Sequence, residues 1–349
     1  MSNEVQVDTL GGGSGIAAQL LKHGFNPNAL RPFAMNADGQ AYIANAQSNG
    51  VIPVQNATLL YDEWKFIDRA VRQTAKQRLR WVNTLRAMGL TMALPNAMSK
   101  TVMTYQNQSD ISAAQVSMDG LGKGNNDRPD YDLTTIPIPI VHKDFFFSAR
   151  ELATSREGGH PLDTSNAELA TRMVSETIEE MHLGTYGTYA YGGGTLYGLV
   201  NFPSRNTRTI TAWDASSKTG LLRLTDVLNM KQDLLTARHY GPYKLLISAN
   251  YETILDDEYS TAYPQTLRQR IMQIESIDSI EVSDWLSDDT LVLVQMTSDV
   301  VQLINGFDPV VVQWETEGGM RLNFKVMAIL PPRIRADYNS RCGIVHATV

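Results

Sequence analysis

Cysteine is almost absent from this chain of 349 residues, in which Cys342 is the only thiol. A single cysteine excludes an intrachain disulfide and a zinc site built on several cysteines. Long apolar runs are absent too, and no stretch approaches the roughly 20 residues of a membrane-spanning helix. The opening MSNEVQVDTL is polar and acidic, without the basic and apolar regions of a signal peptide. We therefore expect no signal peptide, no membrane partner and no stabilising disulfide.

Motifs that carry catalysis or bind metals are missing as well. The six histidines are scattered, with no HxxxH or HExxH pair for zinc, and no GxSxG elbow supports a hydrolase triad. The glycine run at 11–15 lacks the Lys-Ser/Thr pair of a phosphate-binding loop. The run at 192–198 follows a predicted helix rather than a strand, unlike a dinucleotide-binding turn. We expect no catalytic residue, no cofactor and no metal site.

Two acidic clusters leave one alternative open. The run at 256–258 and the group formed by Asp284, Asp288 and Asp289 could bind a divalent ion. They lack the spacing of an EF-hand loop, which favours a solvated surface.

Charge of one sign does not dominate the chain, whose net charge is −7. This balance gives no global signature of nucleic-acid binding. The 43% apolar content is enough for one large or two ordinary domains. Residues 1–57 are rich in Gly, Asn, Gln and Ala, which favours a flexible arm.

Apolar residues recur with helical spacing just after the arm. Leu60 and Met88 bound the pattern, and Gly89 ends it, so one amphipathic helix is predicted between them. Its basic residues form either a solvated surface or a face turned toward a polyanion or an acidic neighbouring subunit. The candidates for an inner, nucleic-acid-facing surface are Lys65, Arg69, Arg72, Lys76 and Arg80.

Residues 100–141 predict a long two-stranded hairpin. One arm starts at Thr101 and the other covers 131–141, with turn-forming residues at 120–130 between them. In the IPIPI run the prolines remove hydrogen-bond donors from one edge, so this strand pairs on one side only; a polyproline-like linker is the alternative. The arms are too polar to build a core, so the hairpin lies either on another copy of the chain or on its own domain. The candidate contact residues between subunits are Tyr105, Lys123, Arg128, Ile136 and Ile138.

A long helix is predicted from Ser165 to about Ala190, with a length close to 40 Å. Ser165 and Glu168 have the spacing of a capping box. Ala170, Val174, Thr177, Met181 and Gly184 form its apolar stripe, and Glu176, Glu179 and Glu180 lie mostly off that stripe. The preceding run Phe145-Phe146-Phe147 is expected to anchor the core.

The remainder predicts mixed helices and strands. A helix capped by Thr225 runs to His239, and a buried strand covers Lys244–Ser248. Short helices follow at 251–259 and 264–274. Strands are then predicted at 279–282, 291–296, 300–305, 310–314, 320–330, 333–338 and 343–349.

The order of these segments resembles the major capsid protein fold of tailed phages, which encapsulin shells share. The local similarity is to the encapsulin-like branch. It lies in the run IPIPIVHKDFFFSARELATSR, with its turn at Phe147–Leu152, in the long helix and the glycine turn at 192–198, and in the late strand Phe324-Lys325-Val326. The resemblance covers about residues 58–349 and implies an α+β fold.

This resemblance implies five segments. The first three are an N-terminal arm at 1–57, a helix region at 58–99 and an extended loop at 100–141. The fourth is a peripheral domain at 142–205 plus 318–349, which contains the long helix that begins at Ser165 and acts as a strut (the strut helix). The fifth is a mixed α/β axial domain at 206–317. It also implies a shell of pentamers and hexamers around double-stranded DNA, bound without sequence specificity. Scaffolding, portal and decoration proteins are further implied partners, in a virion assembled in the host cytoplasm.

Three functions compete. The first is a non-enzymatic coat subunit of an icosahedral virus head, which the long arm favours because encapsulins usually lack one. The second is an encapsulin-like compartment. The third, from another class, is a soluble α/β enzyme with a site assembled from scattered residues such as His142, Asp144 and Asp256.

Overall fold

The computed structural model describes residues 61–114, 116, 118–119, 126–157, 164–260 and 263–349. The predicted arm at 1–57 and the predicted contact residue Lys123 lie outside these ranges.

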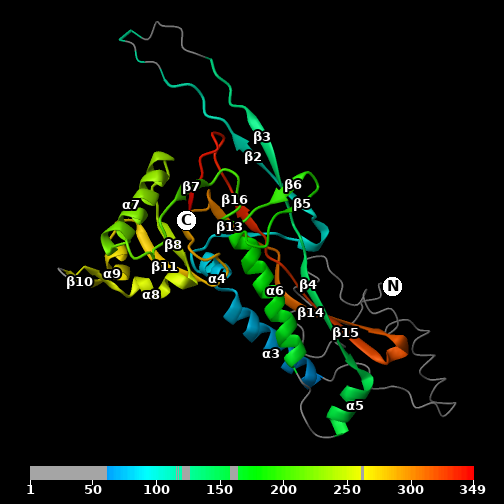
Figure 1. The fold of residues 1–349 in the computed structure, drawn as a ribbon. Coiled ribbons are helices and arrows are strands. Elements are labelled where there is room, and N and C mark those ends of the chain that lie inside the picture. Colours follow the sequence, from blue (N-terminus) through cyan, green and yellow to red (C-terminus); the bar gives the residue numbers. More distant parts are fainter. Residues whose placement is uncertain (1–60, 115, 117, 120–125, 158–163, 261–262) are drawn as a thin grey trace, which may run out of the picture.

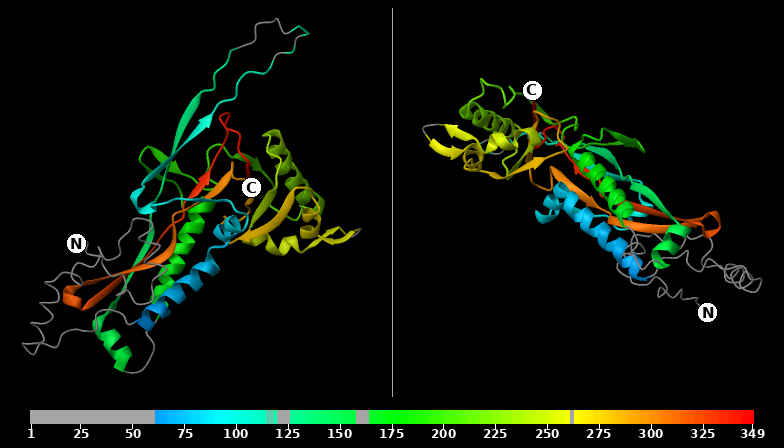
Figure 2. Two further views of the ribbon diagram at one scale, coloured as in Figure 1. Left: turned by 180° about the vertical axis from the view of Figure 1, so that it is seen from behind. Right: turned by 60° about the horizontal axis from the view of Figure 1, so that its bottom comes forward.

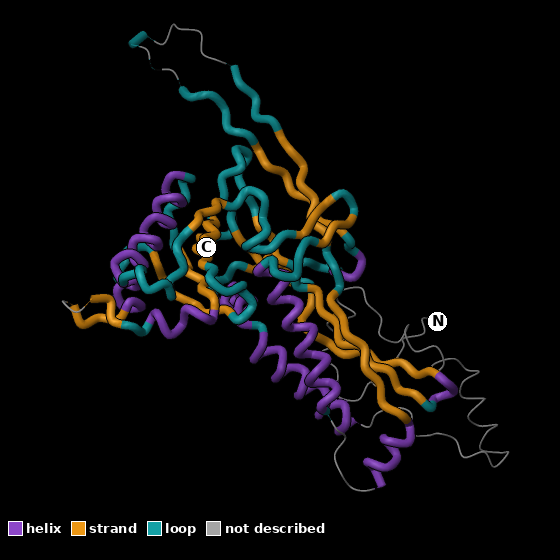
Figure 3. The backbone as a smooth tube through the Cα atoms, viewed as in Figure 1, coloured by secondary structure: helices purple, strands orange, loops and turns teal. Residues whose placement is uncertain are grey.

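The described chain forms an elongated lobe, a second and more compact lobe, and a hairpin that projects from the place where they meet (Figure 1). The two views in Figure 2 show the hairpin leaving the body in both orientations. Helices and strands are mixed throughout (Figure 3). The elongated lobe contains α3 (Tyr61–Arg78), α4 (Arg80–Ala87), β4 (Val141–Ser148), α5 (Ala149–Glu157), α6 (Ser165–Leu183), β14 (Phe307–Thr316) and β15 (Arg321–Ile329).

A three-stranded antiparallel sheet of order β14-β15-β4 backs the helices of this lobe. Phe324 of β15 is fully buried, stacks on Phe145 at 5.1 Å between ring centroids and meets Phe147 edge-on at 5.6 Å. Phe146 points to the opposite face and is half exposed. Period-two alternation therefore makes core anchors of Phe145 and Phe147 only.

The predicted first helix is two helices. Leu79 separates α3 from α4 with a non-helical backbone, and both Leu79 and Trp81 are buried. Ile67 and Val71 keep the predicted apolar face against α6. Gly89 ends α4 with a φ of +71°, as its position after the last periodic residue predicts.

The predicted strut helix is shorter than expected. α6 has 19 residues, which corresponds to about 28 Å. It ends because Gly184 adopts a left-handed backbone with a φ of +97° and closes the helix. A Cβ atom on Gly198 would lie 2.2 Å from the Gly184 nitrogen, so the glycine turn packs directly on this cap.

The start of α6 also differs from the prediction. Its N-cap is Thr164, one residue before Ser165, and the Thr164 side chain makes no capping bond to a backbone amide. Instead, the Thr164 hydroxyl donates to the Glu168 carboxylate at 3.1 Å.

The compact lobe is built on a five-stranded sheet of order β11-β8-β12-β17-β7. Its strands alternate between two cores. Leu245 and Ile247 of β8 face a cluster with the helices of this lobe, whereas Leu246 faces the core that contains α3, α4 and α6. The elements are β7 (Asn206–Thr209), α7 (Gly220–Thr236), β8 (Tyr243–Ser248), α8 (Glu252–Leu255), β9 (Glu258–Ser260), β10 (Tyr263–Thr266), α9 (Leu267–Met272), β11 (Ile277–Ser283), β12 (Leu291–Gln295) and β17 (Ile344–Thr348).

Most strands predicted for this half are present, but the helix predicted from Thr225 begins earlier. α7 starts at Gly220 after the N-cap Thr219, whose hydroxyl accepts from the Leu222 amide at 3.4 Å. Thr225 lies inside the helix and bonds back to the Leu221 carbonyl at 2.8 Å. α7 also ends at Thr236, before His239.

Strand pairing joins segments that the prediction divided. β14, placed in the axial segment, pairs with β15, and β17, placed in the peripheral segment, pairs with β12 and β7. A smaller sheet of order β1-β13-β16 lies between the lobes, formed by β1 (Thr91–Ala93), β13 (Val301–Asn305) and β16 (Pro332–Ile334).

No helix among the described residues is both long enough and apolar enough to cross a bilayer.

Candidate functional site

The projecting hairpin consists of β2 (Val102–Gln108) and β3 (Tyr131–Pro137), paired antiparallel from Val102–Pro137 to Gln108–Tyr131. The two chains stay together beyond the strands, where the Ser109 amide donates to the Asp130 carbonyl at 2.9 Å and the Ser112 amide to the Asp127 carboxylate at 2.8 Å. β3 pairs with β2 only, among the described strands. The IPIPI run is not one strand as predicted, because β3 ends at Pro137 and residues 138–140 lie between β3 and β4. The hairpin is thus held by backbone bonds with almost no core of its own.

The far part of the hairpin leaves apolar side chains in water. Val116 and Met118 are fully exposed, and Ile111 is 62% exposed. The described part of the chain therefore leaves these apolar side chains uncovered, and exposed apolar surface of this kind is typical of interaction sites.

The predicted contact residues of the hairpin fall into different surroundings. Ile136 and Ile138 are each only 5% exposed and belong to a core cluster of their own chain, so they do not offer contact surface to a neighbour. Arg128 is exposed near the far end.

Tyr105 lies at the hairpin base, where it contacts two arginines of its own chain. The guanidinium groups of Arg333 and Arg335 lie 5.1 Å from the centre of its ring. Burial raises the pKa of Tyr105, although its bond with Thr134 and the two arginines act in the opposite direction. Arg333 also donates to the Gln302 amide oxygen at 2.6 Å. These contacts fix the base of the hairpin to β13 and β16.

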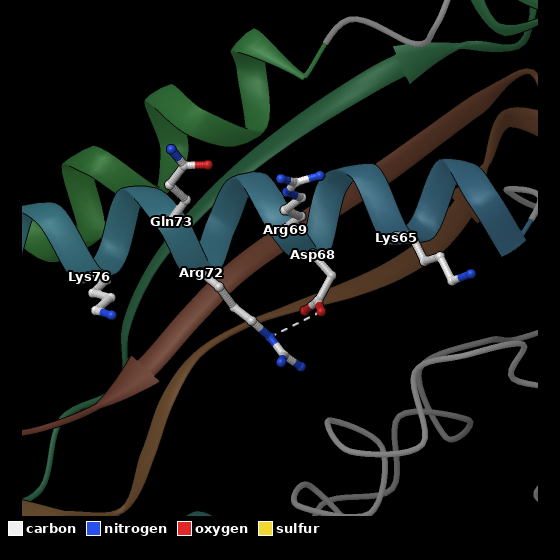
Figure 4. Close-up of a pocket in the computed structure, with 6 residues that line it drawn as sticks. All are labelled: Lys65, Asp68, Arg69, Arg72, Gln73 and Lys76. Atoms are coloured by element: carbon white, nitrogen blue, oxygen red, sulfur yellow. Dashed lines mark ion pairs between the residues drawn. The ribbon is translucent and has the colours of Figure 1, made fainter.

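The basic candidates on the first helix are all exposed. Ile67 and Val71 turn toward the core, so the helical period places the basic residues outward. Figure 4 shows two rows of side chains: one side of α3 carries Lys65, Asp68, Arg72 and Lys76, and the other carries Arg69 and Gln73. These six residues line a shallow depression of about 440 Å³.

Part of this positive charge is neutralised within the chain. Arg72 Nε lies 3.0 Å from an Asp68 oxygen, one helical turn away. Farther along, Arg78 contacts Glu176 at 3.9 Å, and Arg86 pairs with Asp308. Arg69 and Lys76 form no ion pair with any described residue, so their charge is not compensated within the described part of the chain.

Sequence reasoning missed Glu179. It was placed off the apolar stripe, but its side chain is only 2% exposed. Its carboxylate accepts from the Trp81 amide at 3.0 Å and the Val82 amide at 3.2 Å, at the start of α4. Burial, and secondarily the negative charge of Glu281, raises its pKa to about 7, while the two amides and Arg80 lower it. The sequence carried no signal for this role, because the amides lie almost 100 residues away.

The three residues proposed for an enzyme site are not brought together. His142 and Asp144 are neighbours on β4, with Nδ1 and Oδ1 3.7 Å apart, and both are about half exposed. Asp256 lies in the other lobe and pairs with Arg268 at 3.0 Å. No group of three or more metal-ligating side chains is present within the described part of the chain.

Several solved structures have the same fold. A virus-like particle from Pyrococcus furiosus matches with a TM-score of 0.55 and 17% identity, over 80% of this chain and 98% of that one. The capsid of Myoviridae phage XM1 matches with a TM-score of 0.54 and 12% identity, over 71% and 86%. Mycobacterium phage Bobi matches with a TM-score of 0.54 and 11% identity, over 74% and 87%. The chain therefore has the α+β fold of tailed-phage capsid proteins, which encapsulin-like shells share, as its sequence predicts.

Sequence comparison points the same way. The diheme-cytochrome-encapsulin shell fusion protein of Kuenenia stuttgartiensis is 25% identical over 201 residues, which are 57% of this chain and 50% of that protein. This chain thus spans about half the length of that curated relative. Residues 54–347 match the family described as "Family of unknown function (DUF6260)", and the chain belongs to that family.

Proposed function

We propose that this chain is the coat subunit of an icosahedral virus head, assembled from pentamers and hexamers. One observation carries the proposal: a hairpin with fully exposed Val116 and Met118 projects from a body whose fold is that of capsid proteins. The hairpin has too little core to be stabilised alone, and a neighbouring subunit supplies the missing surface. Repetition of such contacts by symmetry closes the shell, and no catalytic step is involved.

The segments take the roles that the fold suggests. The hairpin at 100–141 overlaps the neighbour, and the lobe of α3, α6 and the β14-β15-β4 sheet forms the peripheral domain. The compact lobe forms the axial domain, which meets its copies at the five-fold and six-fold centres. Scaffolding, portal and decoration proteins are further partners, and assembly takes place in the host cytoplasm.

Packaged double-stranded DNA is the proposed content of the head. The exposed face of α3, with Arg69 and Lys76 uncompensated, is the surface that we assign to it. Contacts of this kind with phosphates carry no sequence preference.

An encapsulin-like compartment is the second candidate, favoured by the shell-fusion relative from Kuenenia stuttgartiensis. Electron microscopy and mass spectrometry of particles purified from an expressing host separate the candidates. Closed particles support a shell, a portal vertex and nucleic acid support a virus head, and copurified protein cargo supports a compartment. A monodisperse subunit that never assembles under any salt or pH condition contradicts both.

The basic face gives a testable charge effect. The double variant Arg69→Glu and Lys76→Glu should still form particles, because both side chains are exposed. Its particles should retain roughly half as much nucleic acid as the wild type, or less, since the reversed charges repel phosphate. The ratio of absorbance at 260 and 280 nm measures this content. The matched control is Lys100→Glu with Lys143→Glu, two exposed lysines on other elements, and equal ratios in both variants would contradict the assignment.

A further inference from the structure

The two lobes meet at a small cavity lined by charged side chains. Its volume is about 230 Å³. One wall is the junction between α3 and α4, another is α6, and the third is β11 with the residues that follow it. The ionisable side chains that line it are Arg78, Arg80, Glu179, Glu281 and Asp284.

Glu179 connects two of these walls. It belongs to α6, yet both of its oxygens accept backbone amides at the start of α4, directly after the break at Leu79. Trp81 and Val82, which donate those amides, are themselves buried. The side chain therefore fixes the angle at which α4 leaves α3 against α6.

The third wall of the cavity, formed by β11, contains a second carboxylate, that of Glu281. Glu281 of β11 pairs with Lys244 of β8 at 2.6 Å and accepts from the Thr84 hydroxyl of α4 at 3.1 Å. Lys244 is itself largely buried. This ion pair ties the compact lobe to α4 and keeps a negative charge facing Glu179.

The other ionisable groups near Glu179 have the following partners and effects on its carboxyl. Arg80 lies close enough to favour its ionised form. Arg78 and Arg172 share Glu176, one turn earlier on α6. His182, on the next turn, is kept neutral because burial lowers its pKa to about 4, and its Nε2 bonds to the Leu330 carbonyl at 2.8 Å. Asp284, which follows β11, also lines the cavity, whereas Glu180 of α6 does not.

We propose that Glu179 is a proton-controlled joint between α6 and the α3–α4 pair, in which the uncharged carboxyl keeps these helices packed and loss of its proton loosens their contact. The inference concerns the single chain, so it holds whether or not the shell function is correct.

The direction of the pH dependence follows from the environments of the Glu179 carboxyl in the packed and the open state. In the packed joint its pKa is raised to about 7, and in an opened joint it returns to its ordinary value of 4.5. Between these values the packed joint holds one more proton than the open one. The equilibrium constant that favours the packed state over the open state is therefore largest below pH 4.5. It falls by at most about tenfold per pH unit as the pH rises, and it stays constant above pH 7.

Hydrogen–deuterium exchange of the full chain tests the joint. The peptide that contains the Trp81 and Val82 amides is followed between pH 5 and 8.5, with exchange times adjusted for the intrinsic pH dependence. Its protection should fall between pH 5 and 7 by more than tenfold and then level off. In Glu179→Gln the protection should remain as high as in the wild type at pH 5, with no such fall. Glu180→Gln, on the adjacent residue, should retain the wild-type profile.

Glu281→Gln provides an independent reading. Removal of the facing charge lowers the pKa of Glu179, so the fall in protection should level off at a lower pH. Equal wild-type protection at pH 5 and 7.5, or an unchanged fall in Glu179→Gln, overturns the proposal. If Glu179→Gln does not fold, as judged by circular dichroism, an unshifted profile in Glu281→Gln overturns it instead.

Discussion

Replacement of residues 110–129 by Asn-Gly should give a folded subunit that no longer assembles. Ser109 and Asp130 already exchange two hydrogen bonds, at 2.9 Å and 2.8 Å, so a two-residue turn can join them without disturbing β2 and β3. The body keeps its cores, because Ile136 and Ile138 lie outside the deletion. The neighbour loses all contact with the far part of the hairpin. Light scattering after size-exclusion chromatography should show only small species, with an unchanged near-ultraviolet circular dichroism spectrum.

A milder variant separates hairpin length from apolar contact. Val116→Ser with Met118→Ser keeps the full hairpin and removes only its exposed apolar side chains. It should lower the yield of particles without abolishing them, since the backbone of the loop can still reach the neighbour. Closed shells at wild-type yield from the truncated chain would refute the role assigned to the hairpin.

Phe324→Ala should produce the largest loss of stability among single core substitutions of the elongated lobe. The ring is fully buried and contacts both Phe145 and Phe147. Its removal leaves a cavity between the β14-β15-β4 sheet and the helices, at a cost of about 3–5 kcal/mol in the free energy of unfolding. Urea unfolding is measured best in the hairpin-truncated background, where assembly does not complicate the transition.

Phe146→Ala is the matched control from the same aromatic run. Phe146 is half exposed, and Arg321 lies over its ring at 3.8 Å from the centre. The loss of this exposed contact should cost less than about 1 kcal/mol. Similar losses in the two variants would mean that the sheet does not present Phe146 and Phe324 to opposite sides.

The parts of the fold that follow local rules were accessible from the sequence. Strand alternation and turn residues identified the hairpin, and the continuous apolar run at Lys244–Ser248 identified a strand buried on both faces, as β8 is. The order of the segments was sufficient for the fold itself. Helical periodicity also placed Lys65, Arg69, Arg72, Lys76 and Arg80 on the surface.

The errors arose where a distant segment decides the local structure. The helical spacing of apolar residues continues on both sides of Leu79, so the local sequence does not mark the break between α3 and α4. Glu179, from a distant segment, stabilises that break through the Trp81 amide. α6 packs against α3 and also against β4 and β15, so it buries more than one stripe, including the Glu179 carboxyl that a one-sided helix would leave in water. The spacing of Gly184 was compatible both with a continued apolar stripe and with the end of the helix. Close packing of Gly198 against Gly184 accompanies the end of the helix, and this contact is not visible in the local sequence. The joint was therefore invisible in the sequence, whereas the basic face was not.

β17 occupies an interior position in the five-stranded sheet, between β12 and β7. Val345 pairs with Asn206, a partner synthesised about 140 residues earlier, so the ribosome releases most of this lobe before its sheet can be completed. Pairing over such a separation slows folding, because a long loop must close first. The elongated lobe depends on a late strand as well, because Phe324 of β15 pairs with Phe145 of β4, about 180 residues earlier. A nascent chain therefore lacks the finished sheets of both lobes until its last strands are made, which keeps it from joining its neighbours prematurely.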